Sequence, residues 1–277
     1  HDEVPSLRRR GKRGGQFGCG YGTMNSSTYY FDLIFHLVRC DFVTRYKGSV
    51  LGVLWSPMIP LAQLLVLVFL FQKVVPLDID AYPAFVFSAL LPWTWLSTCL
   101  GSAGCLLVSN RGLVRRPNFA PVTLIIVNTV SGMLNYVVAL PILIAILIFY
   151  DRTITLTLLM LPLLMLIQGA LTVGLSLIIA TLNVFYRDVQ HIVNVALMLL
   201  FYLTPVFYQP QAVSENFRLL YTFSPIAALI QSYRAIFFYG VFPEWRLLVF
   251  AGATSLVVCG IGYLIYIRCL HDVVDTI

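Results

Sequence analysis

The chain has 277 residues, of which 59% are hydrophobic and only 11% are charged. Soluble domains carry roughly 25% charged residues, so this chain has too few to cover the surface of a domain of its length. We therefore expect much of its surface to face lipid, which excludes an ordinary soluble enzyme. The net charge of +6 does not indicate nucleic-acid binding, because the basic residues flank apolar segments.

The N-terminal part differs from the rest. Residues 1–28 are basic and rich in glycine, and they predict a flexible basic tail without the apolar core of a signal peptide. Residues 29–47 predict an amphipathic helix in the cytoplasmic membrane interface, capped by Ser26–Thr28. At helical spacing, one face of it holds Phe31, Ile34, Phe35, Val38 and Phe42, and another holds Asp32, His36 and Arg39.

Residues 48–277 contain six long windows that lack Asp, Glu, Lys and Arg. Each window reaches the roughly 20 residues that a helix needs to cross a bilayer. The sequence therefore predicts an all-α integral membrane fold with six transmembrane helices, near residues 48–72, 82–108, 121–149, 154–183, 189–206 and 247–267.

Residues 207–246 are apolar and aromatic but do not predict a further crossing. Their apolar run, Leu219–Tyr233, spans about 22 Å as a helix, which is short of a hydrocarbon core of roughly 30 Å. Pro225 breaks this run. We expect a re-entrant helical hairpin in the outer leaflet.

Basic residues set the orientation. With the N-terminus in the cytoplasm, thirteen of the eighteen lysines and arginines fall on the inner side. This distribution satisfies the positive-inside rule, so both termini are expected in the cytoplasm.

No constellation for catalysis is present in the sequence. The four histidines are scattered, the six cysteines show no metal-binding spacing, and no phosphate-binding loop G-x-x-x-x-G-K-[ST] occurs. The predicted spans also lack the ionisable groups at mid-membrane that ion-driven transporters use. We expect no metal, cofactor or catalytic residue in this chain, and any ATP and magnesium to be bound by a separate subunit.

Two short loops on the cytoplasmic side combine charged and apolar residues. The first lies within Ser109–Pro121 and the second within Asn183–His191. Taken singly, their arginines fit membrane anchors of the positive-inside kind. Together they predict a surface on which an ATPase docks, made by Arg111, Leu113, Arg115, Arg116, Phe119, Tyr186, Arg187 and Asp188.

The chain resembles the membrane subunit of type-two ABC exporters, in the branch that exports O-antigen, capsule or teichoic acid. The resemblance covers nearly everything from residue 29 onward. Its segments, in order, are RYKGSVLGVLWSPMIP (45–60), LPWTW (91–95), SNRGLVRRPNFAP (109–121), NVFYRDVQHI (183–192), LTPVFY (203–208) and SPIAALIQSYR (224–234).

This resemblance implies a homodimer that works with two copies of a cytoplasmic ABC ATPase in a bacterial cell membrane. It also implies a polysaccharide or polyol-phosphate substrate carried on undecaprenyl diphosphate. The sequence does not distinguish a neutral glycan from a teichoic acid, although Arg218 and Arg234, placed outside, lean toward a phosphate-bearing chain.

Aromatic residues suit a path for a sugar polymer, because their rings stack on sugar faces. The candidates for this translocation path are Phe69, Trp93, Trp95, Phe201, Tyr202, Phe207, Tyr208 and Tyr233. For each of them alone, core packing or an interfacial belt is the more ordinary role, and the cluster in Phe201–Tyr208 is the leading candidate for lining the path. Arg45 and Lys47 are candidates for holding the lipid diphosphate where it enters, or for anchoring the helix in the membrane.

Two other functions stay open from the residues. One is a type-two ABC permease for a small lipid or drug. The other is a membrane-embedded glycosyl- or phosphotransferase, which the few scattered outer acids disfavour.

Overall fold

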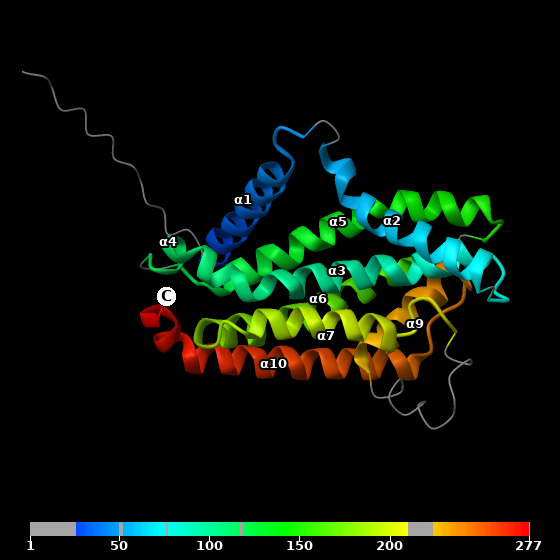
Figure 1. The fold of residues 1–277 in the computed structure, drawn as a ribbon. Coiled ribbons are helices and arrows are strands. Elements are labelled where there is room, and N and C mark those ends of the chain that lie inside the picture. The colour runs from blue at the N-terminus through cyan, green and yellow to red at the C-terminus, as the bar shows by residue number, and fades with distance from the viewer. Residues whose placement is uncertain are drawn as a thin grey trace, which may run out of the picture.

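The computed structural model describes residues 26–49, 52–75, 77–116, 119–153, 155–209 and 224–276. In this part of the chain all regular structure is helical. The long helices run side by side as a bundle (Figure 1). The prediction of an all-α membrane fold is confirmed at this level, since five helices are long and apolar enough to cross a bilayer.

The five spanning elements follow the predicted windows in chain order. The first joins η1 (Gly52–Leu54), α2 (Trp55–Phe69) and η2 (Leu70–Val74). Next come α3 (Tyr82–Ser109) and α5 (Val122–Phe149), with the short α4 (Arg111–Val114) between them. The last two are η3 (Leu156–Met160) with α6 (Leu161–Phe185), and most of α10 (Trp245–Thr276).

The sixth predicted span is shorter than expected. Its helix, α7, covers Val189–Leu203, and its 15 residues reach about 22 Å. Pro205 follows closely, and a proline both lacks a backbone donor and disfavours helical geometry in the residue before it. The six-span count therefore stays a prediction.

α3 forms the centre of the bundle. It contacts α2, α5, α6, α7 and α9 (Pro225–Phe237). Its first half is almost fully buried, from Tyr82 to Trp93. On one side of it α6 and α10 pack closely, because a Cβ on Gly174 would overlap the backbone of Cys259. Small residues that let backbones approach are typical of helix pairs in membranes.

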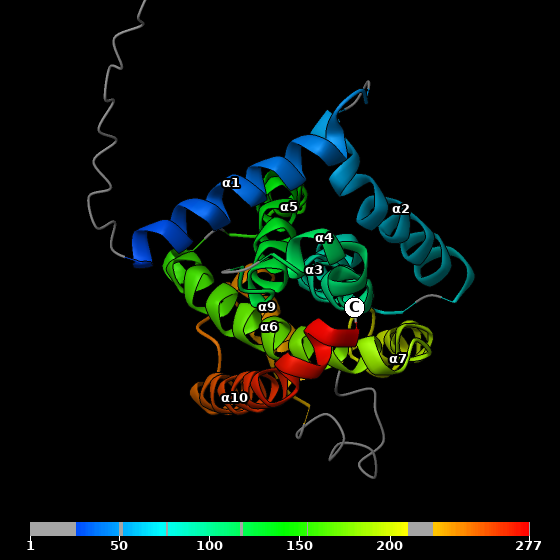
Figure 2. The ribbon, with the colours of Figure 1, turned by 90° about the vertical axis from the view of Figure 1, so that its left-hand side faces the viewer.

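α1 (Ser26–Tyr46) lies across the end of the bundle that carries α4, and it contacts α5 (Figure 2). The amphipathic pattern is less sharp than predicted. Val38 is buried, Phe35 is 63% exposed, and Leu33 and Leu37, outside the predicted apolar face, are half-buried. An exposed Phe35 is compatible with a face that meets lipid, so the interfacial position of the helix stays a prediction.

The predicted hairpin is described only in part. Residues 210–223, which would form its first arm, lie outside the described residues, as do residues 1–25 of the predicted tail. Pro225, the predicted break, is the first residue of α9, where its missing donor costs nothing. The Ser224 side chain accepts a hydrogen bond from the Ala227 amide at 3.3 Å and caps this helix.

Candidate functional site

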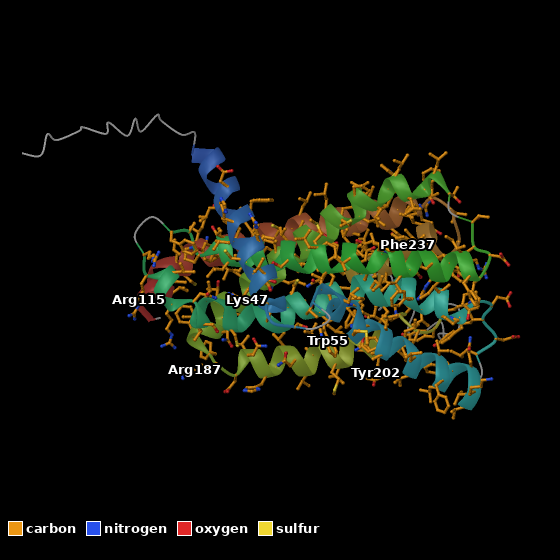
Figure 3. All side chains as sticks on the ribbon, turned by 90° about the horizontal axis from the view of Figure 1, so that it is seen from above. Lys47, Trp55, Arg115, Arg187, Tyr202 and Phe237 are labelled. Atoms are coloured by element: carbon orange, nitrogen blue, oxygen red, sulfur yellow. The ribbon has the colours of Figure 1, made fainter. Side chains whose placement is uncertain are left out.

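The two predicted docking loops lie at the same end of the bundle, which we call the basic end. Figure 3 places Arg115 and Arg187 there, with Phe237 toward the opposite end. Six of the predicted docking residues are exposed, namely Arg111, Arg115, Arg116, Tyr186, Arg187 and Asp188. The basic end therefore presents a charged surface formed by two segments about 70 residues apart in the sequence.

The two apolar docking candidates point differently. Leu113 and Phe119 are half-buried and pack against a cluster that includes Leu107, Ile125 and Leu177. In this structure they fasten the first loop to the bundle, so the surface offered to a partner is mainly the arginines.

A groove opens between α2, α3 and α7, with a cavity of about 570 Å³. Three of the predicted path residues line it: Trp93 from α3, and Phe201 and Tyr202 from α7. Sequence reasoning missed its other lining residues, Ala62, Gln63, Val66, Leu67, Ser97, Leu197 and Met198. A signal for them exists, because lining residues recur three or four positions apart on each helix, and so share a face.

Aromatic rings continue from the groove toward the end opposite the basic end. Phe201 lies 5.8 Å from Trp93 and 5.8 Å from Phe207, measured between ring centres. Phe207 in turn stacks on Phe71 at 5.3 Å and meets Tyr208 edge to face at 5.0 Å. Tyr202 also lies 5.4 Å from Phe201. Five predicted path residues therefore form one connected aromatic series: Trp93, Phe201, Tyr202, Phe207 and Tyr208.

The other three path candidates lie elsewhere. Phe69 on α2 is 65% exposed and does not line the groove. Tyr233 is fully buried, with its ring 5.9 Å from that of Tyr136. The Trp95 ring nitrogen donates to the Thr129 carbonyl at 3.1 Å, which ties α3 to α5.

Trp95 also lines a second cavity of about 290 Å³, between α2, α3 and α5. Trp55, Asn135 and Tyr136 are among its other lining residues. The two cavities share no lining residue, and they lie on different sides of α3, since Trp93 and Ser97 line the groove while Trp95 and Cys99 line this cavity.

Lys47, a candidate for holding the lipid diphosphate, follows α1 directly and is exposed. Figure 3 shows it between Arg115 and Trp55 along the bundle. The other candidate, Arg45, belongs to α1, but its side chain lies outside the described residues.

Arg234 is placed differently from the outer charge that the sequence predicted. It is 2% exposed, and its Nη2 donates to the carbonyls of Pro205 and Val206 at 2.9 and 2.8 Å. Its guanidinium carbon lies 3.7 Å from the Phe85 ring centre. Arg234 thus fixes the turn after α7 that carries Phe207 and Tyr208.

Comparison with known proteins decides the family. The family model described as ABC-2 type transporter matches residues 32–238. The chain belongs to the ABC-2 type transporter family. The match runs from α1 to the end of α9, so it includes both loops of the basic end and every helix that lines the groove.

Individual relatives of this ABC-2 chain carry a more specific name. It is 34% identical over 230 residues to a protein of Myxococcus xanthus named O-antigen export system permease protein RfbA, covering 82% of this chain and 88% of that one. It is 32% identical over 214 residues to a Klebsiella pneumoniae protein of the same name, covering 77% and 83%.

Proposed function

We propose that this chain is the membrane permease of an ATP-driven exporter that moves a lipid-linked polysaccharide out of the bacterial cytoplasm. The observation that carries the proposal is the match, over most of the chain, to permeases named for O-antigen export. The aromatic series beside the groove supports a sugar substrate, because aromatic rings stack on sugar faces. The small-lipid or drug permease is less well supported, since these relatives are named for O-antigen.

ATP is hydrolysed by a partner in this proposal. The chain contains no phosphate-binding loop, and the basic end offers arginines from two loops to a second protein. Guanidinium groups on such a surface form bidentate pairs with carboxylates of a partner. An ABC ATPase, with its bound ATP and magnesium, would dock there in two copies, one for each permease chain.

The proposed assembly contains two permease chains with the groove between them. α7 buries none of its residues within one chain, and Met198, Leu199 and Tyr202 are all more than half exposed. Contact of the groove with lipid alone would be unfavourable. Gln63 and Ser97 also line the groove, and placing polar side chains in hydrocarbon raises the free energy. A second copy would enclose these polar groups in a path for the polymer.

The proposed topology has six crossings, with α7 and the turn after it forming the fifth. α6 and α10 both end at the basic end, so the segment between them must return to the opposite end, and α7 runs in that direction (Figure 1). The basic end would face the cytoplasm.

Thiol labelling tests this topology. A cysteine at Phe242, which is 62% exposed, should react with an impermeant thiol reagent outside intact cells, and one at Arg115 should not. The reverse pattern would contradict this topology.

Removal of the protein from its bacterium tests the function. We expect surface polysaccharide to disappear and its lipid-linked precursor to accumulate inside, both reversed when the gene is returned. Normal surface polysaccharide in cells that lack the protein would contradict the proposal.

A further inference from the structure

Asn183, near the end of α6, joins three helices through one side chain. Its amide nitrogen donates to the Gly104 carbonyl of α3 at 2.9 Å. Its Oδ1 accepts the backbone N–H of Gln190 in the first turn of α7 at 3.0 Å. The second bond satisfies a donor that the helix itself leaves open, and Asp188 before α7 makes no side-chain cap. Asn183 therefore caps α7 from the neighbouring helix while holding α3.

Gln190 adds a second connection between α7 and α3. Its Nε2 donates to the Gly101 carbonyl and lies 3.3 Å from Oδ1 of Asn194, one turn further along α7. The thiol of Cys105 on α3 lies 3.8 Å from Gln190 Oε1. We call Asn183, Gln190 and the two glycine carbonyls the amide joint.

Gly104 is a requirement of the amide joint. A Cβ at this position would overlap Gln190 Oε1 and come within 3.1 Å of the Asn183 side chain. A side chain at this position would therefore displace the Gln190 amide and crowd that of Asn183. At Gly169 on α6, by contrast, a Cβ would meet nothing within 4 Å.

The position of the joint connects the basic end with the groove. Asn183 precedes the exposed loop Tyr186–Asp188, and Gln190 follows it, so the joint brackets the second docking loop. α3, on the other side of the joint, leads directly into the first docking loop at Arg111. α7 continues from the joint to Phe201 and Tyr202 in the groove. Because α7 has no buried residue, these bonds are its most specific attachment at the basic end.

We infer that Asn183 and Gln190 are coupling residues, which transmit a displacement of the docking loops into movement of α7 along the groove. This inference rests on the proposed function, in which an ATPase moves the loops. Side-chain amide bonds between helices suit the task, since they are directional and face little competition from water within a membrane. The two residues position α7 and need touch neither the ATPase nor the polymer.

The test measures coupling and assembly separately in purified permease–ATPase complexes. We choose three variants. Asn183→Leu removes both bonds of Asn183, Gln190→Met leaves the Asn183 cap in place, and Gly104→Ala displaces the Gln190 amide from the joint. Polymer exported per ATP hydrolysed should fall by about tenfold, equivalent to ~1.4 kcal/mol, which is within the range of interhelical hydrogen bonds in membranes. The amount of ATPase bound should stay within about twofold. Gly169→Ala is the matched control and should behave as the unaltered chain.

A second measurement follows α7 directly. A cysteine at Met198 in the groove, in a chain whose six native cysteines are serine, reports on access to a thiol reagent. We expect its labelling rate to change between the ATP-bound and nucleotide-free complex, and this change to vanish in Asn183→Leu and Gln190→Met.

Three results would overturn the inference. One is an unchanged nucleotide response of Met198→Cys in both joint variants. Another is a fall in export that is matched by an equal fall in ATP hydrolysis. The last is loss of the bound ATPase in all three variants, because the joint would then serve only to hold the docking surface in place. Failure of the proposed function looks different, because the unaltered complex would itself hydrolyse no ATP or export no polymer.

Discussion

The guanidinium of Arg234 on α9 stacks against the ring of Phe85 on α3, with 3.7 Å between its central carbon and the ring centre. The same guanidinium holds the carbonyls of Pro205 and Val206. A cation buried in this way is stabilised by the ring's negative face and by the two carbonyl dipoles. It links α9 and α3 to the turn after α7 that carries Phe207.

Arg234→Met should destabilise the turn after α7 and lower the stability of the protein. We expect the temperature midpoint of unfolding to fall by about 5 °C, because the substitution removes two hydrogen bonds and a cation–π contact from a buried site. Arg234→Lys should also lower the midpoint, since a lysine lacks the planar guanidinium that lies over the Phe85 ring. Arg246→Met is the control, because Arg246 is exposed at the same end. Equal midpoints for the Arg234 and Arg246 variants would show that the contacts contribute nothing.

Phe201→Ala and Tyr202→Ala should lower export without reducing the amount of protein in the membrane, because neither side chain is fully buried. Both side chains line the groove, and loss of an aromatic contact with a sugar removes about 1 kcal/mol of interaction, a severalfold effect. Export is measured as polysaccharide reaching the cell surface over time. Phe149→Ala removes an aromatic residue that is 80% exposed on α5, away from the groove, and should have no effect. Equal losses at all three positions would refute a specific role for the groove.

Arg115→Glu and Arg187→Glu should weaken binding of the ATPase. Both arginines are exposed at the basic end, and reversing the charge replaces attraction to carboxylates by repulsion. We expect the co-purified ATPase to fall by about tenfold for the double variant, with a larger loss at low salt than at high salt. Arg246→Glu, at the other end of the bundle, should leave binding unchanged. Full binding by the double variant would place the docking surface elsewhere.

Single cysteines at Leu199 or Tyr202 should crosslink two copies of the chain if the groove faces its partner copy. Both residues lie on the exposed side of α7, and Tyr202 is 62% exposed. Leu166 is the control, because it is 71% exposed but lies on α6 and lines neither cavity. Crosslinking at Leu166 with none on α7 would put the dimer contact on a different face.

The long helices were predictable because each coincides with a window that lacks charge. A segment of that length without charges crosses hydrocarbon as a helix, since a helix satisfies its own backbone hydrogen bonds. The end of α7 was missed for the same reason, since a window defined by charge does not register Pro205. Spacing also did not show that Leu33 and Leu37 of α1, outside the predicted apolar face, would be half-buried, because they are as apolar as the residues of that face.

The candidate sites were predictable where side chains carry their own signal. The exposed arginines and the aromatic series at Trp93, Phe201 and Phe207 follow from residue type and position. The roles of Arg234 and Asn183 could not be predicted from the sequence, because both bind backbone carbonyls, which every residue type has. Only the fold brings those carbonyls to them.

Translocation by a purified system tests the central claim most directly. The permease and its ATPase are reconstituted in vesicles with lipid-linked polysaccharide, and the fraction of polymer that becomes accessible to an impermeant glycosidase is followed after ATP is added. We expect accessibility to rise only when ATP, the ATPase and the permease are all present, and the permease alone to hydrolyse no ATP. A rise without the ATPase, or none with the complete system, would contradict an ATP-driven exporter of polysaccharide.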